Sequence, residues 1–120
     1  MSESATQRRA KMAEAITAHR RGGSRDPVVF ASGDDEAALV EYVDREITVQ
    51  VDAAQQERLD DLLEAFPVFK IAQPATRKAQ DGEVHLSALT DPKHCSDFLD
   101  RLFLDVFDQR DSYAVRVTDA

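Results

Sequence analysis

Alternating apolar and polar residues predict short β-strands in the first half of the chain. Residues 27–32, "PVVFAS", are rich in β-branched side chains and end at the turn-prone "SGDD". Two further runs alternate on either side of the turn-like pair "DR": Ala38, Val40 and Tyr42, then Ile47, Val49 and Val51. This pattern favours a tight β-hairpin, and the alternative is a helix capped by Ser32 and Asp35.

Two later segments show the periodicity of amphipathic helices. The first, residues 53–66, follows Asp52, which has Gln55 at capping-box spacing, and it stops before a proline. The second, residues 92–108, follows Asp91 and has proline at its first position. Their apolar residues are expected in the core: Leu59, Leu62, Leu63 and Phe66, then Cys95, Phe98, Leu99, Leu102, Phe103 and Val106.

The strands expected around these helices define the fold class. They are "VFKIAQ" (68–73) and "EVHLSAL" (83–89), joined by the loop 74–82, and "SYAVRVT" (112–118) at the end. The order predicts an α+β fold, a mostly antiparallel sheet of five or six strands with two helices on one face. A ferredoxin-like βαββαβ order and a duplicated ββα unit both remain open. Val49, Leu86 and Val115 are also expected in the core.

The N-terminal segment has a different pattern. Residues 5–20 favour a helix, because alanine alternates there with glutamine, lysine, arginine and glutamate. Its apolar stripe consists of Ala5, Met12 and Ile16 and is interrupted by Arg9. Because this stripe is thin, we expect the helix to anchor only weakly in a core. The stretch "RRGGSRDP" then breaks the helix. Residues 1–27 are therefore interpreted as a basic arm on a hinge, and residues 28–120 as an acidic α+β domain.

Composition places the chain among compact cytoplasmic proteins. The sequence has 120 residues, of which 42% are hydrophobic, enough for a core. The longest apolar runs fall short of the ~18–20 residues that span a bilayer, and the N-terminus lacks the apolar part of a signal peptide. A lone cysteine, Cys95, excludes an intramolecular disulfide.

Charge adds a second feature to this picture. There are 23 acidic residues against 15 Lys and Arg, and only four of the bases are lysine. This composition is typical of proteins from halophiles that work in concentrated salt. Residues 1–25 hold six basic and two acidic side chains, a balance of +4, whereas the remainder holds nine basic and 21 acidic ones, a balance of −12. The arm and the domain therefore have opposite signs.

A basic arm suggests nucleic acid, but screening weakens that interpretation. About six phosphate contacts lose several orders of magnitude in affinity between ~0.1 M and molar salt, and no aromatic side chain lies in the arm to stack on bases. We therefore expect the arm to dock on an acidic protein surface, that of a partner subunit or of another protein. The candidate residues for contact with a partner or with nucleic acid, in the arm and in residues 70–78, are Arg8, Arg9, Lys11, Met12, Ile16, Arg20, Arg21, Lys70, Arg77 and Lys78.

Association with another protein chain is the expected mode of action. Two helices cover one face of the predicted sheet, so the other face and the strand edges remain open. We expect a homodimer with no enzymatic activity.

The alternative function is a DNA-binding regulator that resembles a winged helix in the order of its elements. The arm and the loop 74–82, with Arg77 and Lys78, would supply its cations. Against it, the helix that would enter the major groove, residues 53–66, carries four acidic side chains and one arginine.

The sequence offers few candidate residues for metal binding or catalysis. His85, Asp91 and His94 are the residues considered for a metal, but the spacings typical of zinc sites are absent from the sequence. Cys95 falls in register with the apolar stripe of its helix, which predicts a buried structural thiol. No nucleophile–base pair or glycine-rich phosphate loop is evident, so no catalytic residue and no cofactor are expected. A small metal- or ligand-binding domain is the second alternative.

Overall fold

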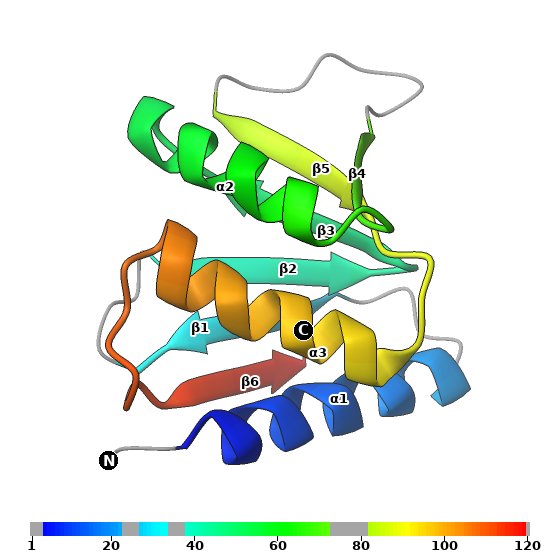
Figure 1. The fold of residues 1–120 in the computed structure, drawn as a ribbon. Coiled ribbons are helices and arrows are strands. Elements are labelled where there is room, and N and C mark those ends of the chain that lie inside the picture. Colours follow the sequence, from blue (N-terminus) through cyan, green and yellow to red (C-terminus); the bar gives the residue numbers. More distant parts are fainter. Residues whose placement is uncertain (1–3, 23–26, 34–37, 73–81, 120) are drawn as a thin grey trace.

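The computed structural model describes residues 4–22, 27–33, 38–72 and 82–119. In these residues three helices cover one face of a six-stranded sheet (Figure 1). The helices are α1 Ala5–Gly22, α2 Ala53–Ala65 and α3 Pro92–Arg101, and α3 continues into a π-helical segment, η1 Leu102–Val106. The predicted α+β class is confirmed.

All pairings in the sheet are antiparallel. The strands are β1 Val28–Ser32, β2 Leu39–Val43, β3 Glu46–Gln50, β4 Lys70–Ala72, β5 Glu83–Ser87 and β6 Val115–Asp119, in the order β4-β5-β3-β2-β1-β6. The four strands of the βαββαβ order are present, but the hairpin β1–β2 separates β3 from β6. The strand edges of the sheet are therefore β4 and β6.

Local sequence signals explain where the elements begin. Asp52 and Gln55 form the predicted capping box, with Gln55 N donating to Asp52 Oδ1 at 2.8 Å. Asp91 caps α3, and His94 N donates to its Oδ1 at 2.7 Å. Residues 44–45 form the turn between β2 and β3 with positive φ angles of 49° and 62°, a geometry typical of tight hairpins. The hairpin prediction is confirmed over the helical alternative.

The core lies between the sheet and the helices. Phe69 and Phe98 stack with ring centroids 4.1 Å apart, and Phe66 packs edge-on against both. Of the predicted core residues, Leu63 and Phe66 lie at the margin, and the others are buried: Val49, Leu59, Leu62, Leu86, Cys95, Phe98, Leu99, Leu102, Phe103, Val106 and Val115. The sequence patterns thus locate most of the core.

The expectation that the N-terminal helix anchors only weakly in the core is wrong. Its apolar stripe is thin, yet Met12 and Ile16 are completely buried, and α1 packs along α3 and beside β6 (Figure 1). The reason is a polar residue, because the position one turn before Met12 is Arg8, which is itself completely buried. The helix is anchored by a buried cation together with two apolar side chains.

Candidate interaction surfaces and pockets

Arg8 lies in a closed network of hydrogen bonds between α1, α3 and the segment before β6. Its Nε donates to Asp100 Oδ1 at 2.7 Å, and its Nη1 donates to the carbonyl oxygens of Asp111 at 2.7 Å and Tyr113 at 3.1 Å. The Tyr113 hydroxyl donates to Asp100 Oδ1 at 2.9 Å, and the guanidinium lies 4.1 Å from the Tyr113 ring centroid. Each group of this buried set therefore has a partner.

Burial and charge shift the ionisation of the network. Burial alone would lower the pKa of Arg8, but the hydrogen bond and negative charge of Asp100 raise it above its ordinary value. Burial, reinforced by Asp100, raises the pKa of Tyr113. Arg8 therefore stays charged and Tyr113 stays a hydrogen-bond donor, so the network is a structural anchor for α1.

Three further cations of α1 also contact the chain that carries them. Lys11 Nζ donates to the carbonyl of Val115 at 2.8 Å. Arg20 Nε donates to the Tyr42 hydroxyl at 2.9 Å. Arg9 Nε lies 3.8 Å from Asp97 Oδ1 and 3.5 Å from Asp100 Oδ2, while Arg21 is exposed. The acidic surface on which the basic helix docks includes α3 of its own chain.

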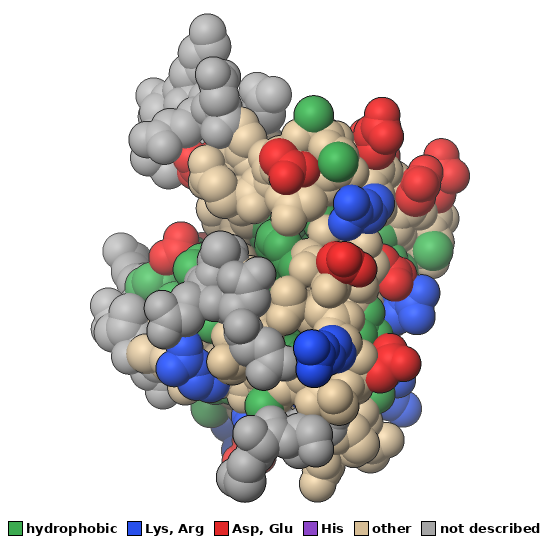
Figure 2. Space-filling view, turned by 90° about the vertical axis from the view of Figure 1, so that its left-hand side faces the viewer, with side chains coloured by type: hydrophobic (Ala, Val, Ile, Leu, Met, Phe, Trp, Pro, Cys, Tyr) green, Lys and Arg blue, Asp and Glu red, His purple; other side chains and the backbone are tan. Residues whose placement is uncertain are grey.

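The remaining basic candidates do not join α1. Lys70 is exposed on β4, which is one edge strand of the sheet. Helix α1 lies beside β6, at the opposite edge. Arg77 and Lys78 fall outside the described residues. Figure 2 shows acidic side chains gathered at the upper right, over α2, whose exposed residues include Glu57, Asp60, Asp61 and Glu64.

The three metal candidates serve separate contacts. His85 Nδ1 lies 2.7 Å from Glu46 Oε1, and its Nε2 lies 2.7 Å from Glu83 Oε1. Asp91 caps α3, and His94 packs against Phe66 and Phe69. Within the described part of the chain, no cluster of three or more His, Cys, Asp or Glu side chains is arranged to hold a metal.

Cys95 is buried, as its register predicts. The thiol is completely enclosed, and burial raises its pKa, although the nearby Arg20 guanidinium acts in the opposite direction. Arg20 Nη2 lies 3.7 Å from Sγ. A protonated thiol without solvent access is a packing residue rather than a nucleophile.

The two edges of the sheet differ in how they are covered. At β6, Lys11 from α1 bonds a strand carbonyl. At β4, no strand among the described residues pairs with the outer side. Ile71 (53% exposed) lies in the strand and Val68 (37%) two residues before it, and Leu89 (66%) follows the end of β5, the strand that pairs with β4. In the part of the chain that the structure describes, the fourth exposed large apolar residue is Leu39, on β2. Sequence periodicity missed this edge, because the strand order was open.

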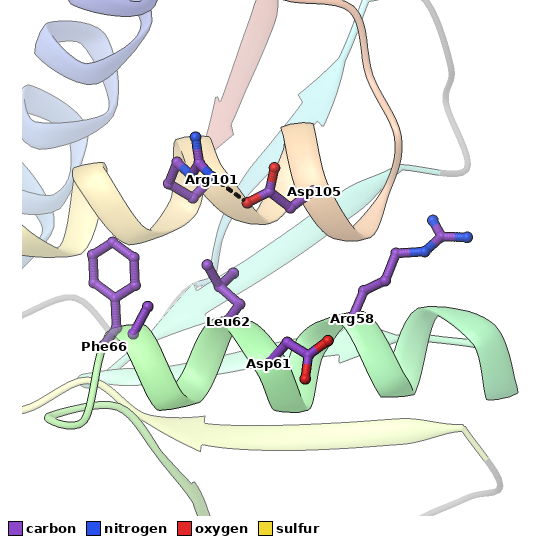
Figure 3. Close-up of a pocket in the computed structure, with 7 residues that line it drawn as sticks. Arg58, Asp61, Leu62, Phe66, Arg101 and Asp105 are labelled. Atoms are coloured by element: carbon purple, nitrogen blue, oxygen red, sulfur yellow. Dashed lines mark ion pairs between the residues drawn. The ribbon is translucent and has the colours of Figure 1, made fainter.

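A groove of about 310 Å³ separates α2 from the end of α3 and η1. Leu62 in α2 and Phe66 directly after it point toward α3 and η1, where Arg101 and Asp105 lie (Figure 3). Arg101 Nη2 pairs with Asp105 Oδ2 at 2.7 Å, and Arg58 Nη1 donates to the Val106 carbonyl at 3.3 Å. Both arginines of this groove therefore have partners within the chain, and Asp61 adds a second acid to the lining.

A second pocket, of about 300 Å³, lies between α1 and α3. Its lining residues are Thr6, Arg9, Ala10, Ala13, Lys93, Ser96 and Asp97. The walls combine two alanine methyl groups with two cations, two hydroxyl groups and one acid, so this pocket offers both apolar surface and positive charge.

Comparisons with other proteins give the family. Among the described residues, no helix combines the length and apolar character needed to cross a membrane. Comparisons with curated proteins and with solved structures give no match. A family model described as a family of unknown function, DUF7975, matches residues 1–120, and the chain belongs to this family.

Proposed function

We propose that the protein is a non-enzymatic homodimer in which two copies associate through their β4 edges. The observation that carries this proposal is the concentration of exposed apolar side chains at one sheet edge. Val68, Ile71 and Leu89 are three of the four exposed large apolar residues in the described part of the chain. An open edge strand with apolar neighbours is a template for pairing with another strand.

A second copy suits this edge because the contact is self-complementary. Two β4 strands that pair antiparallel about a twofold axis through Ile71 place each Ile71 beside that of the other copy, and Lys70 opposite Ala72. Such an interface is isologous and closes at two subunits. The two Lys70 side chains lie only two residues apart across the axis, so we expect salt, which screens their repulsion, to strengthen the dimer.

The DNA-binding alternative has less support. Arg8, Lys11 and Arg20 donate hydrogen bonds within the chain, which leaves fewer cations for phosphates. The exposed face of α2 carries acidic side chains that would meet phosphates with like charge. Retention of genomic DNA fragments by the full chain in molar KCl, with loss of retention in Arg21→Ala or Arg77→Ala, would favour this alternative.

Sedimentation velocity at micromolar concentration tests the homodimer. We expect a dimer in molar KCl and a monomer for Ile71→Lys, because the substitution replaces the apolar contact at the twofold axis with two ammonium groups that would lose water on association. Leu39→Lys is the matched control, since it changes an exposed apolar residue on β2 and should leave the dimer intact. A monomeric wild-type protein, or a dimeric Ile71→Lys variant, would contradict the proposal.

A further inference from the structure

We infer that the pocket between α1 and α3 binds a small organic carboxylate, with Arg9 and Lys93 as the groups that recognise its negative charge. This pocket lies beside α1, which packs near β6, and is independent of the β4 edge.

Arg9 is held in place by acids beneath it. Its Nε lies 3.5 Å from Oδ2 of Asp100, a residue that is completely buried and bonded to Arg8 and Tyr113. That Nε is itself buried and forms no hydrogen bond within the described residues. This side of the guanidinium therefore faces the two carboxylates, and a ligand has access only to the other side.

The outer nitrogens of the same guanidinium remain open to a ligand. The Arg9 side chain is 41% exposed, and among the described residues its Nη atoms make no hydrogen bond. A guanidinium fixed through one side and open at its fork suits bidentate binding of a planar carboxylate. Because acids already hold the arginine, less side-chain freedom is lost when an anion binds.

The other walls of the pocket define the rest of the ligand. Lys93 is exposed and supplies a second cation, so the lining carries two cations, Arg9 and Lys93, and one acid, Asp97. Ala10 and Ala13 present methyl groups, and a volume of about 300 Å³ accepts a body of a few carbon atoms. Ser96 is buried, and its hydroxyl donates to the Lys93 carbonyl at 2.7 Å, so recognition of the anion falls to Arg9 and Lys93. Charge and shape together favour a short apolar acid.

The groove between α2 and η1 has a comparable volume but offers no arginine whose two outer nitrogens both remain open to an anion. Its two arginines already have partners, Arg101 with Asp105 and Arg58 with the Val106 carbonyl, and Asp61 adds a second acid to its lining. An anion there would have to displace the existing ion pair. The groove therefore supplies the matched control for the binding experiment.

Titration of the full chain with sodium benzoate, followed by amide shifts in heteronuclear NMR spectra, tests the inference. At low ionic strength we expect saturable shifts at Ala10, Ala13 and Ser96. Benzyl alcohol, which has the same ring without the charge, should bind at least about tenfold more weakly, because it makes no charge-assisted hydrogen bonds. Inorganic phosphate is the third probe, and binding as tight as that of benzoate would overturn the carboxylate assignment.

Four variants locate the binding. Arg9→Gln and Lys93→Gln should each weaken benzoate by about tenfold, the factor for one charge-assisted contact. Ala10→Leu should weaken binding by narrowing the pocket, whereas Arg101→Gln should leave the affinity unchanged. Lys93 and Ala10 are exposed, so their variants retain the fold even if Arg9→Gln does not. Absence of saturable shifts in the wild type, or wild-type affinity in both Lys93→Gln and Ala10→Leu, would overturn the inference.

Discussion

At the scale of single residues, a buried arginine explains how α1 joins the fold. A sequence pattern counts Arg8 as a polar interruption, but its five donors can be satisfied inside a protein when acceptors converge on them. Here the acceptors come from Asp100 and from two main-chain carbonyls near β6. These partners are more than ninety residues away in the chain, so the pattern of a single segment does not reveal them.

Removal of Arg8 alone from this hydrogen-bonded network should strongly destabilise the fold. We expect Arg8→Met to lower the free energy of unfolding by about 3–5 kcal/mol, because it leaves the Asp100 carboxylate buried without its main partner. Urea denaturation measures the change, with Arg21→Met as the exposed control. The double variant Arg8→Met/Asp100→Leu should cost less than the sum of the two single changes. Additive costs would show that the pair is not coupled.

Alkaline pH should also weaken the fold. Burial raises the pKa of Tyr113 and of Cys95 in the folded protein, so the folded state holds protons that the unfolded state releases. Stability should therefore be complete below pH ~9 and should fall as the pH rises through ~9–11, where unfolded thiols and phenols ionise. Denaturation curves from pH 8 upward measure the slope, which should be shallower for Tyr113→Phe. Stability that is constant or rising over this range would exclude the mechanism.

At the scale of the elements, a helix or strand could be predicted where its sequence signal lies within a few residues. The caps at Asp52 and Asp91 and the alternation around residues 44–45 act within a few residues, so both helices and the hairpin could be predicted. Strand order depends on long-range pairing, so the insertion of β1–β2 between β3 and β6 could not. The same holds for the candidate sites, because the Arg9 pocket and the β4 edge exist only once α1 and the strands are placed.

The π-helical end of α3 offers an element-scale test. Phe103 in η1 is completely buried and packs against Phe107 and Tyr113, with ring centroids 5.8 and 5.2 Å away. We expect Phe103→Ala to cost about 3–5 kcal/mol, since it leaves a cavity in the core. Phe66→Ala, at the margin of the core, should cost less when both variants are followed by urea denaturation. An unchanged unfolding midpoint for Phe103→Ala would contradict the packing.

At the scale of the whole molecule, the charge layout combines an internal attraction with a general repulsion. The basic helix α1 meets acidic residues of α3, and the Arg8–Asp100 pair is shielded from ions by burial. The exposed acids of α2 and the rest of the domain remain in solvent, where they repel one another at low ionic strength. Salt should therefore relieve the repulsion without breaking the buried anchor.

The melting temperature should depend on salt, because salt screens the exposed acids but does not reach the buried ion pair. We expect the melting temperature to rise from dilute buffer to molar KCl, because the Debye length falls from ~30 Å at 0.01 M to ~3 Å at 1 M and screens the exposed acids. Asp60→Asn/Asp61→Asn removes two of these exposed charges from α2, so this variant should melt higher in dilute buffer and gain less from salt. Equal gains for both proteins would assign the effect to something other than screening of α2. A flat or falling melting temperature would refute the interpretation of the acidic surface as an adaptation to concentrated salt, and the acids would then need another role.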